Sequence, residues 1–94
     1  MITVTTRLLA AEGREAELRA ALQAICAATL ASPGCRRCEA SKSAHNPRRF
    51  LLIACFADAS AHAAHANSES FAQALPALMD CLEGLPDIEV YEPL

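Results

Sequence analysis

Residues 49–57, RFLLIACFA, are the segment that most restricts how this chain can fold. Side chains alternate between two faces along a β-strand, and here both faces are apolar. One face carries Phe50, Leu52, Ala54 and Phe56, and the other carries Leu51, Ile53 and Cys55. A strand of this kind needs cover on both sides of its sheet. Helices of the same chain can supply one layer, so the sequence predicts that something else covers the second face.

The other segments follow from periodicity and from turn residues. Alternation with period two predicts strands, spacings of three and four predict amphipathic helices, and Gly, Pro and Asn mark their ends. The predicted strands are 2–11, 35–44, 49–57 and 87–92, and the predicted helices are 14–31, 59–66 and 69–83. This order is β-α-β-β-α-β, the ferredoxin-like α+β arrangement. Pro76 lies inside the last predicted helix, so a kink or an early break is expected near it.

The size of the chain bears on what covers the outer face of the sheet. Its 94 residues fit a single domain over 1–94. Because no second domain is available, a second copy of the chain is the simplest cover. The sequence therefore predicts a homodimer whose sheets pack face to face.

Composition argues against several functional classes. The net charge is −3 and aromatic residues make up 4% of the chain, which argues against a nucleic-acid partner. No apolar run reaches the roughly 18–20 residues that span a bilayer, and the N-terminus lacks the basic and apolar regions of a secretory signal. We therefore expect a cytoplasmic protein with no membrane partner, whose five cysteines are free thiols.

Several short stretches in a fixed order give the chain a family resemblance. They are MITVTTRL at the start, EG before the first helix, SPGC after it, RFLL in the long strand, AHANSESF at the second helix and IEVYEP at the end. In this order the chain resembles the antibiotic biosynthesis monooxygenase domain family over essentially its whole length. The resemblance implies a dimeric α+β barrel of ferredoxin-like subunits. It also implies a monooxygenase that acts on an aromatic or quinol-type small molecule without a cofactor.

The sequence departs from the common family pattern in the long strand and after the SPGC turn. Ala54 and Phe56 replace a glutamate and a tryptophan, and Cys38 replaces a tyrosine. Haem-degrading members use an asparagine and a tryptophan where this chain has Thr6 and Phe56, which argues against haem degradation. The lost glutamate and tryptophan favour one alternative function, a catalytically lapsed dimeric module that only binds a small molecule.

His65 is the candidate catalytic residue. The resemblance places it at the family's first helix-end histidine, and a neutral imidazole can take a proton from a phenol or an enol. The alternative is a histidine that faces solvent or caps a carbonyl. His62 lies one helical turn earlier, but no third and fourth ligand falls at a recognisable metal-site spacing, so no metal is expected.

The substrate is expected to lie in a cavity between sheet and helices. Five apolar or amphipathic side chains are candidates to line it: Thr6, Phe50, Phe56, Phe71 and Tyr91. Core packing is the alternative for each of them. Such walls together with one histidine suit a flat aromatic molecule.

Cys35 and Cys38 form a CxxC motif that leads into a strand. Residues three apart in a strand point to opposite faces, so the two thiols are expected to diverge unless a bulge intervenes. Redox or metal use is one interpretation, and packing of Cys38 in the core is the other.

The segment 36–49 is strongly basic, because it carries five Lys and Arg residues against the single acid Glu39. Such a hairpin can attract an anionic ligand, which favours a second alternative function, an isomerase acting on an anionic small substrate. A solvated edge that resists strand-to-strand aggregation is the other interpretation of this charge.

Overall fold

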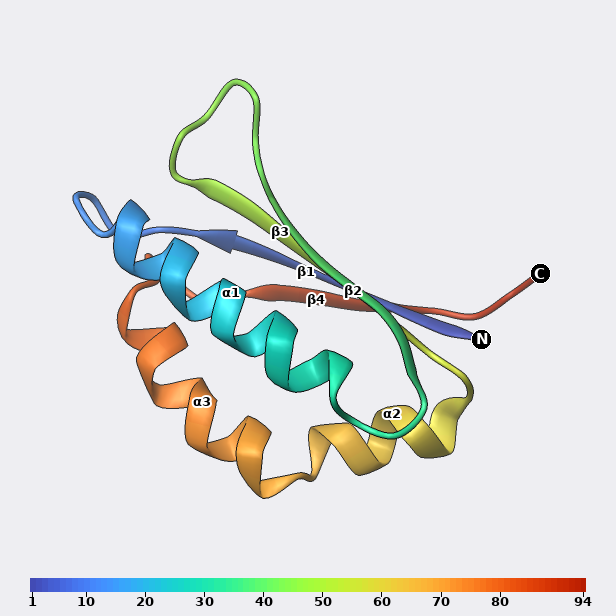
Figure 1. Cartoon of the computed structure of the whole chain (residues 1–94). Helices are drawn as coiled ribbons and strands as arrows, with labels where there is room; N and C mark the ends of the chain where they lie inside the picture. Colours follow the sequence, from blue (N-terminus) through green and yellow to red (C-terminus); the bar gives the residue numbers. More distant parts are fainter.

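A computed structural model describes residues 1–94 as one four-stranded antiparallel sheet with three helices on one of its faces (Figure 1). The strands are β1 (Ile2–Leu9), β2 (Cys35–Lys42), β3 (Arg49–Phe56) and β4 (Asp87–Tyr91), and the helices are α1 (Glu15–Leu30), α2 (Ala59–Ala66) and α3 (Glu69–Asp80). This order confirms the ferredoxin-like arrangement, and the predicted ends differ from the observed ones by a few residues. None of the helices is long and apolar enough to cross a membrane.

The sheet order is β2-β3-β1-β4, so the doubly apolar strand β3 lies inside the sheet. Its residue Ala54 pairs with Val4 of β1 and with Cys38 of β2. Because successive side chains alternate, this register places the even-numbered residues of β1 and β3 toward the helices. Phe50 and Phe56 are accordingly buried on that side.

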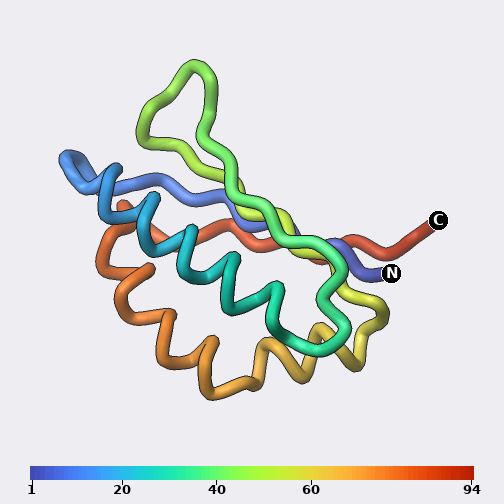
Figure 2. Tube along the Cα trace, viewed as in Figure 1, coloured from blue at the N-terminus to red at the C-terminus, as the bar shows by residue number.

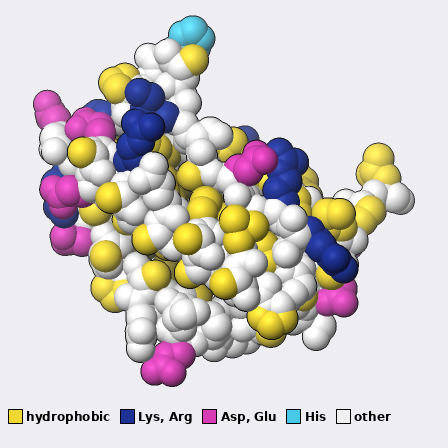
Figure 3. Space-filling view, in the orientation of Figure 1, with side chains coloured by type: hydrophobic (Ala, Val, Ile, Leu, Met, Phe, Trp, Pro, Cys, Tyr) yellow, Lys and Arg dark blue, Asp and Glu magenta, His cyan; other side chains and the backbone are white.

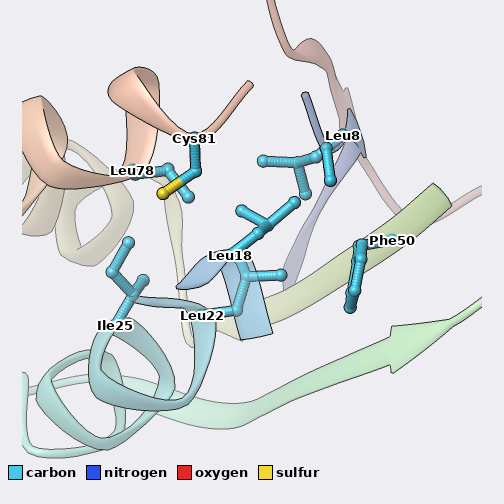
Figure 4. Close-up of a cluster of buried hydrophobic side chains, with 8 residues drawn as sticks. Leu8, Leu18, Leu22, Ile25, Phe50, Leu78 and Cys81 are labelled. Carbon is cyan, nitrogen blue, oxygen red and sulfur yellow. The ribbon is translucent and has the colours of Figure 1, made fainter. Parts of the chain in front are cut away.

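The main core fills the space between α1, α3 and the sheet (Figure 4). Its eight residues are Leu8, Ala10, Leu18, Leu22, Ile25, Phe50, Leu78 and Cys81. The residues from α1 recur at spacings of three and four, so they form the one apolar stripe that the sequence predicted. Each fully buried leucine of this set contributes about 1.5–3 kcal/mol relative to an exposed one.

Helix α3 continues through Pro76 to Asp80, so the helix does not break early at this proline. A proline in a helix removes the hydrogen bond to the carbonyl four residues before it, here Ala72. Ala72 is exposed to solvent, so water can take over its carbonyl. Cys81 caps the end of the helix: its N–H donates to the carbonyl of Leu78, and the N–H of Leu82 donates to the carbonyl of Met79.

The turn after α1 brings the end of that helix against α2. Figure 2 shows the segment around residues 31–35 running beside α2. Gly34 has φ of +84°, and a Cβ atom at this position would lie 2.5 Å from the Cβ of Ala61 in α2. Its carbonyl accepts a hydrogen bond from the N–H of Ala57 at 2.8 Å. Glycine is therefore required here both for the left-handed backbone and for the close approach.

The outer face of the sheet carries no helix. Cys55 is buried on this face beside Thr3, whereas Leu51 and Ile53 remain partly exposed. Charged side chains lie on the neighbouring strands. Arg7 of β1 and Asp87 of β4 form an ion pair there, with 4.0 Å between the guanidinium nitrogen and the carboxylate oxygen. The centre of the outer face is thus apolar and its surroundings are polar.

Candidate functional site

A cavity of about 170 Å³ lies between the sheet, α2, the beginning of α3 and the second half of α1, which contributes Ile25 and Thr29. Most of its wall is apolar. The sheet contributes Val4, Thr6, Leu52, Ala54, Phe56 and Ile88 to this wall. The small side chain of Ala54 leaves room in the middle of β3. The only titratable side chains in the wall are His62 and His65 of α2.

His65 lies between two aromatic rings and against the turn after α1. Its ring centroid is 5.3 Å from that of Phe56 and 5.0 Å from that of Phe71. Its Nδ1 is 3.1 Å from the hydroxyl oxygen of Ser32. The two aromatic contacts and the hydrogen bond fix the plane and the direction of the imidazole. Nε2 has no hydrogen-bond partner in the protein.

The surroundings of His65 favour its neutral form. Burial lowers the pKa of His65 below its usual 6.5, and the charge of nearby His62 lowers it further. In the tautomer with the proton on Nδ1, the ring donates to the oxygen of Ser32 and Nε2 keeps its lone pair. The arrangement can therefore act as a base at neutral pH.

His62 is the second histidine of the cavity wall, and it packs against the same phenylalanine ring. Its ring centroid lies 5.3 Å from that of Phe56. No group of three His, Cys, Asp or Glu side chains in the chain is arranged to hold a metal ion. Within the site, His62 therefore acts on His65 through its charge and helps to shape the wall.

The structure brings together three of the five predicted lining residues. Thr6, Phe56 and Phe71 lie around His65 in the cavity wall. Phe50 lies instead in the main core, farther along β3.

Tyr91, the fifth predicted lining residue, does not reach the cavity. It is on the outer face of the sheet, where it pairs with Thr3 and donates a 2.8 Å hydrogen bond to Glu89. The reason is the alternation along β4: Ile88 and Val90 face the helix side, so Tyr91 cannot. The hydrogen bond to Glu89 raises the pKa of the Tyr91 phenol.

Ser32 is the residue of the site that the sequence did not single out. Its SPG context indicated only the end of a helix, and it lies 33 positions from His65. The contact depends on the close approach of Gly34 to Ala61, which docks the turn onto α2. The only sign of this contact in the sequence is a serine two positions before the glycine that the turn requires.

The thiols of Cys35 and Cys38 do not point to opposite faces of the sheet, because a bulge lies between them. The register between β2 and β3 shifts between Cys35 and Arg37, so that Cys35 pairs with Phe56 and Cys38 pairs with Ala54. Both cysteines therefore pack on the helix side of the sheet, against the wall of the cavity. Cys26 of α1 joins them there.

The basic segment 36–49 does not form one cluster of free cations. Arg37 pairs with Glu39 at 2.8 Å, and Arg48 pairs with Glu83 at 2.8 Å. In Figure 3 the Lys and Arg side chains form separate groups, one near the β2–β3 hairpin and others toward the opposite end of the molecule. A hollow of about 260 Å³ at the hairpin is bordered by Lys42 and Arg49. It contains no histidine and is distant from the apolar cavity.

The sequence model of the antibiotic biosynthesis monooxygenase family matches residues 1–77. The chain belongs to this family. The cavity and both of its histidines lie within the matched region, apart from the Ile88 side of the wall. No curated protein sequence matches the chain.

Solved structures of several bacterial proteins share the fold. A candidate family member from Deinococcus radiodurans is 27% identical with a TM-score of 0.91, over 99% of this chain and 92% of that one. PA3566 from Pseudomonas aeruginosa is 25% identical with a TM-score of 0.87, over 99% and 93% of the two chains. A candidate member from Nitrosomonas europaea is 18% identical with a TM-score of 0.92, over 100% and 99%. The last likeness concerns the fold alone.

Proposed function

We propose that this protein is a cofactor-independent monooxygenase that acts on a flat aromatic, quinol-type small molecule. The observation that carries the proposal is the neutral imidazole of His65, held by Ser32 in an otherwise apolar cavity between two phenylalanine rings. Membership of the antibiotic biosynthesis monooxygenase family supports the reaction class.

The cavity favours a small, flat and uncharged substrate. Its volume of about 170 Å³ lies below the roughly 300–1,000 Å³ of most ligand sites. One or two fused rings suit this volume better than an extended molecule. The rings of Phe56 and Phe71 offer faces and edges for aromatic packing, worth about 0.5–1.5 kcal/mol per pair. No acidic or basic side chain other than the two histidines faces the ligand.

His65 would start the reaction by taking the phenolic proton of the bound quinol at Nε2. The resulting anion is electron-rich and can pass electrons to O₂, which the neutral quinol does only slowly. One oxygen atom then enters the ring and the other leaves as water, so that a quinol and O₂ give a hydroxylated quinone and water. The substrate supplies all four electrons, and no external reductant is needed. General base catalysis of this kind contributes about 10²–10⁴-fold.

We also propose that the active form is a homodimer packed through the outer face of the sheet. The partly exposed Leu51 and Ile53 give that face an apolar centre, and Cys55, the next residue of β3 on the same face, is already buried beside Thr3. Light scattering is expected to give twice the monomer mass at micromolar concentration. An Ile53→Lys variant is expected to shift the mass to that of the monomer, because a charge would lie in the apolar centre. A monomeric wild type would overturn this part of the proposal.

The alternative function of a binding module also has an observation in its favour. Ala54 and Phe56 stand in the cavity wall where the family resemblance places a glutamate and a tryptophan, so the wall has no carboxylate. Such a pocket would take up the same aromatic ligand and leave it unchanged. Binding and turnover must therefore be measured separately.

The deciding experiment follows O₂ uptake with menadiol under air, corrected for the autoxidation measured without protein. Wild type is expected to accelerate uptake, and His65→Gln is expected to lose about 10²-fold or more of that acceleration. His45→Gln, on the exposed hairpin, is the matched control and should keep it. Tight menadiol binding without O₂ uptake would overturn the monooxygenase in favour of the binding module, and equal turnover in His65→Gln would remove His65 as the base.

A further inference from the structure

Two thiols from different elements meet behind the cavity wall. Cys38 of β2 donates its S–H to the sulfur of Cys26 in α1, with a distance of 3.4 Å between the two sulfur atoms. The two residues are 12 positions apart, and the segment between them contains the end of α1 and the docked turn. A disulfide needs a sulfur separation of about 2.05 Å. A modest approach of α1 and β2 would bring the two atoms within bonding distance.

The two thiols differ in their access to solvent. Cys38 is buried, and this burial, followed by the hydrogen bond with Cys26, raises the pKa of its thiol to about 12. Cys26 is partly exposed on the side of α1. A thiolate reacts with oxidants far faster than a thiol does. The accessible Cys26 is therefore placed to react first. The buried Cys38 keeps its proton until the hydroxyl group leaving the Cys26 sulfur takes it up, and its sulfur then closes the disulfide.

The other three cysteines do not share this arrangement. Cys35 packs near the pair, but its S–H points to the carbonyl of Arg37 at 3.5 Å. Cys55 lies on the outer face of the sheet beside Thr3. Cys81 donates to the carbonyl of Ala77 at the end of α3, in the main core. Only Cys26 and Cys38 have their sulfur atoms in direct contact.

We propose that Cys26 and Cys38 form a two-cysteine redox site that reduces a small hydroperoxide and closes as a reversible disulfide. This site is separate from the His65 cavity and does not depend on the proposed monooxygenase reaction. Its substrate class is hydrogen peroxide or a compact alkyl hydroperoxide, because Cys26 is only partly exposed and a small oxidant meets the least steric hindrance there.

The chemistry balances with the peroxide as the oxidant. The Cys26 thiolate attacks one peroxide oxygen, so that an S–O bond forms, the O–O bond breaks and water leaves after protonation. The Cys38 sulfur then attacks the Cys26 sulfur, so that the S–S bond forms, the S–O bond breaks and a second water carries away the Cys38 proton. Two thiols and H₂O₂ thus give one disulfide and two waters. A dithiol reductant reverses the closure by thiol–disulfide exchange.

The experiment treats the fully reduced protein with one equivalent of H₂O₂ and then blocks the remaining thiols with N-ethylmaleimide. Two of the five thiols are expected to disappear, and dithiothreitol is expected to restore both. After tryptic digestion without reduction, residues 20–36 should be linked to residues 38–42. The first peptide carries both Cys26 and Cys35, so the same digest of a Cys35→Ser variant identifies the linked sulfur. A link that persists in Cys35→Ser supports the proposal, and one that vanishes overturns it.

Two variants test the order of the two steps. Cys38→Ser is expected to leave Cys26 as a sulfenic acid that dimedone labels, whereas Cys26→Ser is expected to remove both the labelling and the disulfide. Cys81→Ser changes a buried thiol outside the pair and should close the disulfide like wild type. The proposal would be overturned if all five thiols remained after one equivalent of H₂O₂. It would also be overturned if a non-reducing gel showed that the disulfide forms only between chains. Neither the disulfide mapping nor the dimedone labelling depends on O₂ uptake. The redox proposal can therefore fail or succeed independently of the proposed function.

Discussion

The two ends of the helical layer are built differently. Toward the hairpin, α1 and α3 close over the sheet and bury eight apolar residues, among them Leu18 at 0% exposure (Figure 4). Toward the other end, α2 has no fully buried residue, and the space between it and the sheet is a cavity. Protein interiors are normally packed without voids larger than a water molecule. The filled end therefore supplies stability, and the hollow end is the part of the fold that is free to hold a ligand.

The hollow end is held by a small buried cluster of Cys38, Ala54 and Phe56 and by a few specific contacts. The turn at Gly34 touches Ala61, the carboxylate of Asp58 caps α2 by accepting from the N–H of Ala61 at 2.8 Å, and Ser32 reaches His65. Local contacts of this kind are individually weak, so this end should open more readily than the rest. Substitutions at the filled end should therefore change mainly the stability of the protein, and substitutions at the hollow end should change mainly the geometry of the site.

We expect the greatest loss of stability from a substitution in the main core, at the filled end. Leu18→Ala removes a side chain with no solvent exposure and leaves a void that the sheet cannot collapse into, so the free energy of unfolding should fall by about 2–5 kcal/mol. Leu85→Ala, at a leucine that is 86% exposed, is the control and should change it by less than about 0.5 kcal/mol. Urea unfolding followed by circular dichroism measures both. Equal midpoints for the two variants would show that the main core is not where stability resides.

The next effect concerns the turn that docks onto α2. Gly34→Ala adds a methyl group 2.5 Å from the Cβ of Ala61 at a positive φ, so it should cost about 1–3 kcal/mol and displace α2. Gly84→Ala is matched to it, since Gly84 has φ of +77° but open space around its Cβ position. The difference in unfolding free energy between the two variants isolates the close contact. If Gly84→Ala is as costly as Gly34→Ala, the contact with α2 contributes nothing.

The filled end could be predicted from the sequence, and the hollow end only in part. The order of the predicted strands and helices indicated the fold class, and alternation in 49–57 and the stripe on α1 are local patterns that indicated which faces are apolar. His65 came from the family resemblance, and five scattered apolar or amphipathic residues were candidates for the cavity wall; Thr6, Phe56 and Phe71 lie there, whereas Phe50 lies in the main core. The position of Tyr91 was wrong although alternation with Ile88 and Val90 pointed to the outer face.

The rest of the site depends on geometry that a sequence pattern does not carry. The hydrogen bond between Ser32 and His65 joins residues far apart in the chain through a docked turn. The bulge in β2 brings Cys35 to the same face as Cys38, because a single inserted residue in a strand moves a side chain to the other face. The contact between Cys26 and Cys38 depends on how α1 packs against β2. Helix α3 passes through Pro76 because the freed carbonyl is exposed, which the proline alone does not reveal.

A smaller effect is expected from the cap of α2. Asp58→Ala removes the acceptor for the Ala61 N–H and should cost about 0.5–2 kcal/mol locally. Because α2 buries no residue fully, the loss should appear as faster hydrogen exchange of the amides over 59–66, with little change over 15–30. Ser68→Ala, which removes the cap of α3, is the comparison and should speed exchange at the start of α3 instead. Equal acceleration in α1 would mean that the two ends unfold together.

The smallest effect comes from the protonation of His65. Its pKa is lower in the folded protein than the usual 6.5, first because of burial and then because of His62. As the pH falls below about 6.5, the unfolded chain takes up the proton before the folded one does. The unfolded state then binds more protons, so the free energy of unfolding should decrease with falling pH until the folded pKa is passed. His65→Gln removes this contribution, so the stabilities of wild type and variant should depend differently on pH only in that window.

Removing the neighbouring charge in His62→Gln should raise the pKa of His65 toward its usual value, which an NMR titration of the imidazole measures. A His65 resonance that titrates above 6.5 in the wild type would contradict a neutral base at the hollow end.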